Sequence, residues 1–317
     1  MLNSKPVSYQ VLKFILKHLD PSLRIQLCLV CPSIHTLEKS TPSYIHYLKI
    51  TDNSVTVNRV TCQITVTDRK VDYQFDINQF PSISGTVELR NSRNNLTKTM
   101  KYLLDKLFKG RTVKVGQLAI SCENPLRVPL AARINVNVLE VFDSRSLSAA
   151  SSLIANSCLP LSLIKLPFKS LLKTNNNPIT SIVNRKTKKW HFKAPTTAPH
   201  NLRRVLTFLQ NRRVTTAHFE RGHFCFSIVI EYFMGDSDIE NGTYYTFDTT
   251  RGAVFVVMER SRKRYKAMLE DGSSRRSNQL TIKKNSTSKL VISKIQQGDA
   301  WILGFKIERR RLFPTFF

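Results

Sequence analysis

Glycine is scarce in this chain, with 10 among 317 residues. Loops that cradle phosphate groups need glycine at fixed positions, and neither G-x-x-x-x-G-K-S/T nor G-x-G-x-x-G occurs. The H-E-x-x-H pattern of zinc proteases and the G-x-S-x-G pattern of hydrolases are missing as well. We therefore expect a protein without catalytic residues, without a cofactor and without enzymatic activity.

Long apolar runs are absent too. No run approaches the ~18 residues that span a bilayer, and residues 1–20 contain no small-residue cleavage site of a secretory signal. The six cysteines are spread along the chain, which is not the pattern of a disulfide framework. These features predict a protein of the cytoplasm or nucleus that has no membrane partner.

Metal-binding patterns are incomplete. Cys28 and Cys31 have C-x-x-C spacing, but no second pair follows, and both fall in an apolar helical segment. His218, His223 and Cys225 lie close in sequence without the spacing of a familiar site. We interpret the cysteines as packing residues and expect no metal site.

Acidic residues are few. The 22 Asp and Glu residues oppose 49 Lys and Arg residues, which gives a net charge of +27. Such an excess of positive charge attracts anionic partners, including nucleic acid and acidic proteins.

The densest basic segment is a patch of five residues: Arg260, Arg262, Lys263, Arg264 and Lys266. Alternation with Ser261 and Tyr265 predicts that these charges partly share one face of a strand. Such a face fits phosphate binding, a solvated strand edge that discourages pairing, or a nuclear localisation signal. Because no interleaved aromatics and glycines accompany it, we favour the strand edge or an acidic protein partner over nucleic acid.

Among the features that are present, the first 40 residues are the most informative. Apolar residues at helical spacing predict one short helix up to Leu19 and a second from Leu23 to Cys31. Asp20 is suited to cap the second helix, and Pro21 fits its first turn. Two such helices cannot bury both apolar stripes against each other, so the remaining surface must meet the rest of the chain or a partner.

This segment resembles the F-box, a helical module that docks on the Skp adaptor of a cullin ubiquitin ligase. The resemblance rests on Pro6, Ile15-Leu16, Leu19-Asp20-Pro21, Leu27 and Val30-Cys31. It implies adaptor binding through seven apolar residues: Pro6, Leu12, Ile15, Leu16, Leu19, Leu27 and Val30. Lys5, Pro32 and Ile34 depart from the usual pattern, which leaves open a diverged member that no longer docks.

The middle of the chain carries five short apolar alternations at intervals of 21 to 27 residues, counted in the printed sequence. They are Gln117–Ile120, Val138–Val141, Leu163–Leu166, Lys189–Phe192 and Thr216–Phe219. Each is typical of a short half-buried strand, and helical patterns such as Leu96–Phe108 lie between them. Two interpretations remain open: a leucine-rich-repeat-like array and a non-repetitive α/β domain.

If the repeats stack, the middle residues of these strands form one column, which we predict to be a partner surface. Its members are Ala119, Glu140, Lys165, His191 and His218.

Both flanks of this region are predicted to be β-rich. Gly242–Phe247, Leu290–Ile292 and Trp301–Leu303, together with the first 40 residues, resemble the nematode F-box C proteins. These are presumed ubiquitin-ligase adaptors with a nematode-specific domain of unknown function.

The predicted fold class is therefore α+β or α/β, with F-box-like helices, a leucine-rich-repeat-like array and a β-rich C-terminal part. The predicted segments are 1–45, 46–84, 85–222 and 223–317. We expect a non-catalytic adaptor that brings a target protein to a Skp/cullin-type ubiquitin ligase, and the positive charge of the chain favours an acidic target. The alternatives are a charge-driven nucleic-acid-binding protein and a family member that has lost its dock.

Overall fold

The computed structural model describes the residues 8–66, 71–77, 80–87, 96–109, 112–122, 133–154, 161–167, 187, 189–193, 199–220, 224–235, 239–270 and 277–310. These residues fall into two compact units. The first ends at Leu161 and the second begins at Ser162. The division lies inside the segment 85–222 that the sequence pattern treats as one region.

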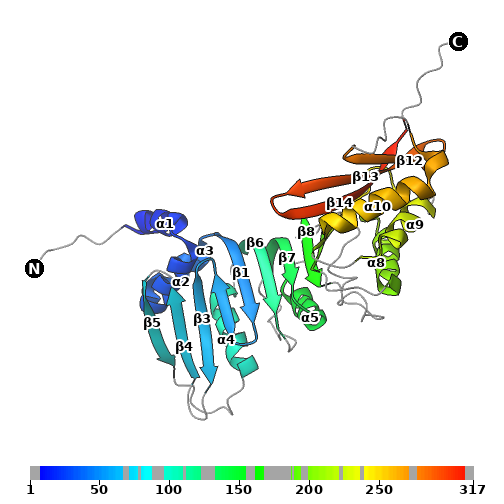
Figure 1. The fold of residues 1–317 in the computed structure, drawn as a ribbon. Helices are drawn as coiled ribbons and strands as arrows, with labels where there is room; N and C mark the ends of the chain where they lie inside the picture. The colour runs from blue at the N-terminus through cyan, green and yellow to red at the C-terminus, as the bar shows by residue number, and fades with distance from the viewer. Residues whose placement is uncertain are drawn as a thin grey trace, which may run out of the picture. The chain divides into compact units, whose positions relative to one another are not determined.

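The first unit begins with three helices and a short 3-10 helix. Their bounds are α1 Tyr9–His18, α2 Pro21–Val30, η1 Pro32–Ile34 and α3 His35–Ser40. Both α1 and α2 pack on α3, and α2 also contacts β1. In Figure 1 these helices gather near one end of the strands that follow.

Seven strands form the sheet of the first unit. Their bounds are β1 Ser43–Thr51, β2 Ser54–Val57, β3 Val60–Val66, β4 Val71–Ile77, β5 Phe80–Val87, β6 Thr112–Ser121 and β7 Arg133–Val141. Their order in space is β5-β4-β3-β2-β1-β6-β7. The pairs from β1 to β5 are antiparallel, whereas β1, β6 and β7 run parallel.

Two helices cover this sheet. The first, α4 (Leu96–Phe108), contacts β3, and α5 (Ser144–Leu153) contacts β6 and β7. The predicted helix Leu96–Phe108 is confirmed, with its apolar stripe facing inward: Met100, Leu103, Leu104, Leu107 and Phe108 are buried. The first unit therefore has its own apolar core.

The second unit alternates strands with helices before it ends in antiparallel strands. The bounds are β8 Leu163–Pro167, β9 Lys189–Lys193, α8 Pro199–Asn211, β10 Thr216–Glu220, α9 Phe226–Gly235, β11 Tyr244–Thr249, α10 Arg251–Arg264, η3 Lys266–Met268, β12 Gln279–Lys283, β13 Ser288–Gln297 and β14 Ala300–Arg309. The strand order is β8-β9-β10-β11-β14-β13-β12. Strands β8 to β11 are parallel, and β14, β13 and β12 continue the sheet in antiparallel pairs.

An aromatic cluster fills the space between this sheet and its helices. The rings of Phe219 and Phe247, on adjacent strands, stack with centroids 4.5 Å apart. Phe226 and Phe233 of α9 both pack on Phe305 of β14, at 6.1 and 6.0 Å. Large buried rings of this kind contribute much of the hydrophobic stabilisation of a core. Figure 1 shows α9 and α10 beside β14, in agreement with their contacts.

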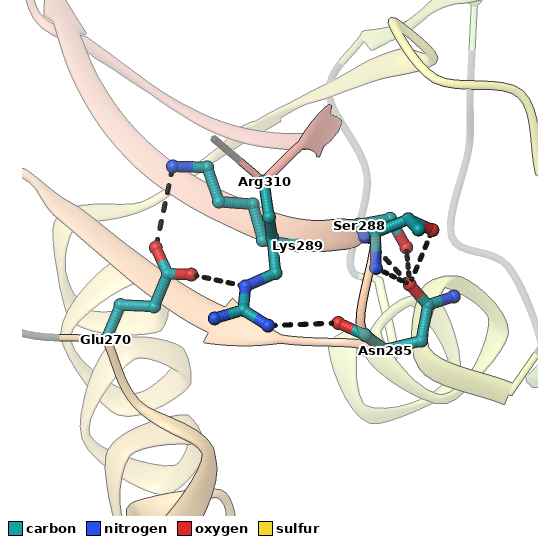
Figure 2. Close-up of polar contacts among 6 residues, drawn as sticks. Glu270, Asn285, Ser288, Lys289 and Arg310 are labelled. Atoms are coloured by element: carbon teal, nitrogen blue, oxygen red, sulfur yellow. Dashed lines mark hydrogen bonds and ion pairs between the residues drawn. The ribbon is translucent and has the colours of Figure 1, made fainter. Parts of the chain in front are cut away.

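Polar contacts fasten the last strands of the second unit, as Figure 2 shows. Glu270 accepts hydrogen bonds from Lys289 Nζ at 3.5 Å and Arg310 Nε at 3.0 Å. In the turn between β12 and β13, Asn285 Oδ1 accepts a bond from the backbone N–H of Ser288 at 2.7 Å. These contacts join the segment after α10 to the ends of β13 and β14.

The predicted fold class is wrong. All five predicted alternations are strands, in β6, β7, β8, β9 and β10, but they belong to mixed, strand-rich sheets and not to a repeat array. In the first unit β6 pairs with β1, which lies far upstream, and antiparallel strands extend the sheet of each unit. The described structure does not identify an F-box fold, although α1 and α2 occupy the two predicted helical segments.

The basic segment is also corrected. Alternation predicts that the basic patch lies on a strand, but Arg251–Arg264 form helix α10. The Thr250 hydroxyl caps it by accepting a bond from the N–H of Ala253 at 3.3 Å. Its last turn holds Arg262, Lys263 and Arg264, where positive charge interacts favourably with the helix dipole.

Candidate functional site

The helices α1 and α2 are each capped by the residue before them. The Ser8 hydroxyl accepts a bond from the N–H of Val11 at 3.3 Å. The Asp20 carboxylate accepts one from the N–H of Ser22 at 2.8 Å, and Pro21 occupies the first turn of α2. The predicted roles of Asp20 and Pro21 are thereby confirmed.

One side of this helical pair is fixed to the body of the first unit. Leu16 of α1 and Leu37 of α3 are buried, and Arg24 of α2 lies 3.2 Å from Glu38 of α3 with both side chains almost fully buried. Asn58, after β2, donates to Asp20 Oδ2 at 3.0 Å. These contacts set the orientation of both helices relative to the sheet.

The Asp20 carboxylate is ionised over a wide pH range. Burial by itself would raise its pKa, but hydrogen bonds from Ser22 and Asn58, together with the charge of His46, outweigh burial and lower the pKa below its ordinary value. The helix cap and the link to Asn58 therefore hold in mildly acidic solution.

Both helices also expose large apolar side chains. Val11, Phe14 and Ile15 of α1 follow the i, i+3, i+4 spacing of one helix face and are 51%, 65% and 43% exposed. On α2, Leu23 and Leu27 share a face at i, i+4 and are also exposed. We call these five residues the apolar docking face.

The seven residues implied by the F-box resemblance are placed differently from one another. Ile15 and Leu27 belong to the apolar docking face, and Leu12 and Leu19 are half-buried. Leu16 is fully buried and presents no surface to a partner. The backbone of Val30 ends α2, and Pro6 lies outside the described residues.

Three residues of the docking face were not among the predicted contacts: Val11, Phe14 and Leu23. The available signal was a second apolar stripe on α1, at Val11, Phe14 and Ile15, beside the stripe that contains Leu16. Sequence periodicity shows that a helix has two such stripes, but it does not show which of them the body of the protein covers.

The five residues of the predicted column are aligned across neighbouring strands, two in the first unit and three in the second. In the first, Ala119 and Glu140 are register partners on β6 and β7. In the second, Lys165, His191 and His218 are register partners on β8, β9 and β10. Glu140 is buried and accepts a hydrogen bond from Gln117 Nε2 at 2.6 Å, so it is a poor contact for a partner.

The two histidines of this column touch. Their rings meet edge to face with centroids 4.6 Å apart. His191 Nε2 lies 3.2 Å from Glu220 Oε1, and His218 Nε2 lies 3.5 Å from Asp248 Oδ1. Burial, followed by the charges of His218 and Lys165, lowers the pKa of His191, and this outweighs the opposite effect of Glu220. Within the described residues no group of three or more His, Cys, Asp or Glu is arranged to hold a metal ion.

The five residues of the basic patch, which lie on α10 and η3, differ in their exposure and in their ion pairs. Arg262 is mostly buried and pairs with Glu259 at 2.7 Å, whereas Arg264 pairs with Glu231 of α9 at 3.2 Å. Arg260, Lys263 and Lys266 are exposed. The charge of the patch is therefore concentrated on fewer residues than the sequence suggests.

The fold and this geometry define a protein with mixed, strand-rich sheets and an exposed apolar face on its N-terminal helices. Residues 95–251, just under half of the chain, match the family model described as Domain of unknown function (DUF3557). The match runs from the residue before α4 to the first residue of α10, so it leaves out the docking face and all five residues of the basic patch. A search of curated proteins and a search of solved structures found no match. Among the described residues, no helix is both long and apolar enough to cross a membrane.

Proposed function

We propose that this protein is a non-catalytic adaptor that recruits a target protein to a Skp/cullin-type ubiquitin ligase. In this proposal the apolar docking face of α1 and α2 binds the Skp-type adaptor. The resemblance of residues 6–31 to the F-box motif, and of the chain to the nematode F-box C proteins, supports the choice of partner.

The observation that carries the proposal is the exposure of five large apolar side chains on two neighbouring N-terminal helices. Each buried Å² of apolar surface contributes about 25 cal/mol, so covering this face with a partner is favourable. Contiguous exposed apolar patches on soluble proteins mark interaction sites. Because Arg24 and Asn58 fix α2, little conformational entropy of this helix is lost when a partner binds.

The test is a binding measurement between the full chain and a purified Skp-type adaptor. We expect the unmodified protein to co-purify with it. Phe14→Asp combined with Ile15→Asp should weaken binding by at least about tenfold, because two exposed anchors become charged. Lys13→Asp is the matched control, since Lys13 is exposed on α1 away from the docking face, makes the same change of net charge and should leave binding unchanged.

Circular dichroism and thermal unfolding of each variant establish that the fold is retained. These substitutions lie on the surface, so both variants should unfold near the temperature of the unmodified protein. Absence of binding by the unmodified chain overturns the proposal. Binding that is indifferent to the double substitution at positions 14 and 15 overturns it as well.

A further inference from the structure

The second unit contains a groove that its fold does not fill. It has a volume of about 1400 Å³ and lies between α9 and α10, beside the end of β11 and the start of β14. Drug-sized ligands occupy pockets of about 300–1,000 Å³, so this groove has room for a longer occupant. All of its described lining residues belong to the second unit.

The topology explains why the groove is there. Strand β11 is the last parallel strand of the sheet, and its other neighbour, β14, runs antiparallel. Helix α9 leads into β11 and α10 leaves it, so the helices separate near the carboxyl end of this strand. Crevices at such ends of α/β sheets are common binding sites.

Apolar side chains line the groove on two sides. Phe226 and Ile230 of α9 line it from one side, and Val256 and Val257 of α10 line it from the other. Val256 is 43% exposed, and the neighbouring Phe255 is 68% exposed. Apolar side chains of an occupant would thus be removed from water here.

The rim of the groove is cationic. Arg260, Lys263 and Arg264 line it, and Asp248 is the one acidic residue among its described lining residues. The Asp248 carboxylate lies 3.5 Å from the imidazole of His218, and Arg264 is paired with Glu231. In the described part of the chain, neither Arg260 nor Lys263 takes part in an ion pair. Two cations are left to meet an anionic occupant.

We propose that this groove binds an acidic peptide segment of a partner protein. Its apolar side chains pack between α9 and α10, and its carboxylates pair with Arg260 and Lys263. The inference rests on the proposed function, because that segment is then the recognition element of the ligase target. Helices that flank an apolar groove with a charged rim are a recurrent arrangement for peptide recognition, and the +27 charge of the chain favours encounter with acidic segments.

A nucleic acid fits these observations less well. Single-stranded nucleic acid binds where a basic groove follows the backbone and aromatic rings stack on the bases. Here the wall facing the cations is formed largely by aliphatic and buried aromatic side chains. An acidic peptide with apolar side chains therefore matches both the apolar lining and the cationic rim of the groove.

The experiment measures fluorescence anisotropy of a short fluorescein-labelled peptide of Glu, Leu and Phe mixed with the full chain. We expect micromolar binding that weakens as ionic strength rises. A peptide with Lys in place of Glu, and one with Ala in place of Leu and Phe, should each bind at least about tenfold more weakly. Oleate and oligo(U) RNA serve as competitors that represent a fatty-acid and a nucleic-acid occupant.

Two double variants locate the binding site. Arg260→Glu with Lys263→Glu should weaken peptide binding by at least about tenfold, since like charges then face each other. Arg251→Glu with Lys266→Glu makes the same change of net charge on exposed residues of α10 and η3 that do not line the groove, and should leave binding unchanged. The unfolding temperature of both variants is measured alongside.

Cys225 gives an independent readout of occupancy. It lines the groove and is partly exposed, so bound peptide should slow its alkylation by iodoacetamide, followed by mass spectrometry of the Cys225 peptide. Absence of peptide binding, equal effects of the two double variants, or displacement of the peptide by oligo(U) or oleate at lower concentration overturns the inference.

The outcome is separable from that of the proposed function. Substitutions at Arg260 and Lys263 should not affect binding of the Skp-type adaptor, and Phe14→Asp with Ile15→Asp should not affect peptide binding. Failure at one site with success at the other identifies which of the two proposals is wrong.

Discussion

The guanidinium of Arg24 and the carboxylate of Glu38 face each other 3.2 Å apart inside the N-terminal helical segment, with 2% and 1% of their side chains exposed. Arg24 Nη2 also donates to the carbonyl of Thr41 at 2.8 Å, and Nη1 donates to that of Pro42 at 3.1 Å. A single side chain of α2 is therefore bonded to α3 and to the residues that precede β1. The position of α2, which carries Leu23 and Leu27 of the apolar docking face, depends on it.

Replacement of Arg24 by Ala should reduce the free energy of unfolding by about 3–5 kcal/mol, because it leaves the Glu38 charge buried without its cation. Urea unfolding followed by circular dichroism measures this loss. Arg59→Ala is the control, since Arg59 is exposed and its removal should change stability by less than about 0.5 kcal/mol. A loss at Arg24 as small as that at Arg59 would contradict the structural role of the pair.

Local patterns in the sequence were sufficient for many single elements. Asp20 and Pro21 predicted the start of α2, and the apolar stripe from Leu96 to Phe108 predicted α4 with its observed bounds. Five short alternations predicted five strands. Such signals involve residues a few positions apart, so a single sequence contains them in full.

The sequence was misleading where two local preferences competed. Residues 253–258 are rich in Val and Phe, which favour strands, yet they form α10 because Thr250 caps a helix whose buried face is Val254, Val257, Met258 and Ser261. The groove was not predictable for the same reason, since one of its walls is α10. The Arg24–Glu38 pair and the choice of the buried stripe on α1 depend on contacts between distant segments, which no local pattern contains.

Close approach of two strands makes Gly116 necessary. A Cβ atom at this position of β6 would lie 2.7 Å from the backbone carbonyl oxygen of His46 on β1. Because a backbone atom cannot rotate away as a side chain does, Gly116→Ala should cost about 1–3 kcal/mol.

Gly252 offers the opposite case within the same chain. A Cβ atom there meets nothing within 4 Å, and the residue lies in the first turn of α10. Gly252→Ala should therefore stabilise the protein by up to about 1 kcal/mol. Denaturant titration of both glycine variants measures the change in the free energy of unfolding. Changes of the same sign and size would contradict the prediction.

Burial raises the pKa of the Cys62 thiol to about 12 and that of Cys122 to about 12. At pH 8 only about one in ten thousand of these thiols is then a thiolate, the form that reacts with alkylating agents. We expect iodoacetamide to modify Cys225, which is partly exposed, and to leave Cys62 and Cys122 unmodified until the protein is unfolded. Peptide mapping by mass spectrometry measures this, and modification of Cys62 in the folded protein as fast as that of Cys225 would contradict it.

The paired histidines of the second unit predict a dependence of stability on pH. Burial, His218 and Lys165 lower the pKa of His191 below its ordinary value of 6.5, whereas Glu220 and Asp248 act in the opposite direction with less effect. Above pH 6.5 this histidine is neutral in both the folded and the unfolded protein, so it imposes no cost on folding. As the pH falls through 6.5, the unfolded chain takes up a proton before the folded protein does, and the free energy of unfolding decreases until the pH lies below the folded pKa of His191.

The substitution His191→Gln removes this titration, so the variant should lose less stability than the unmodified protein between pH 7 and pH 5. All other titrating groups are the same in the two proteins, so their contribution cancels in the difference. Urea unfolding of the two proteins at a series of pH values gives the difference, and NMR titration of the His191 ring gives its pKa directly. A steeper loss in the variant, or a ring that titrates above 6.5, would show that Glu220 and Asp248 dominate its surroundings.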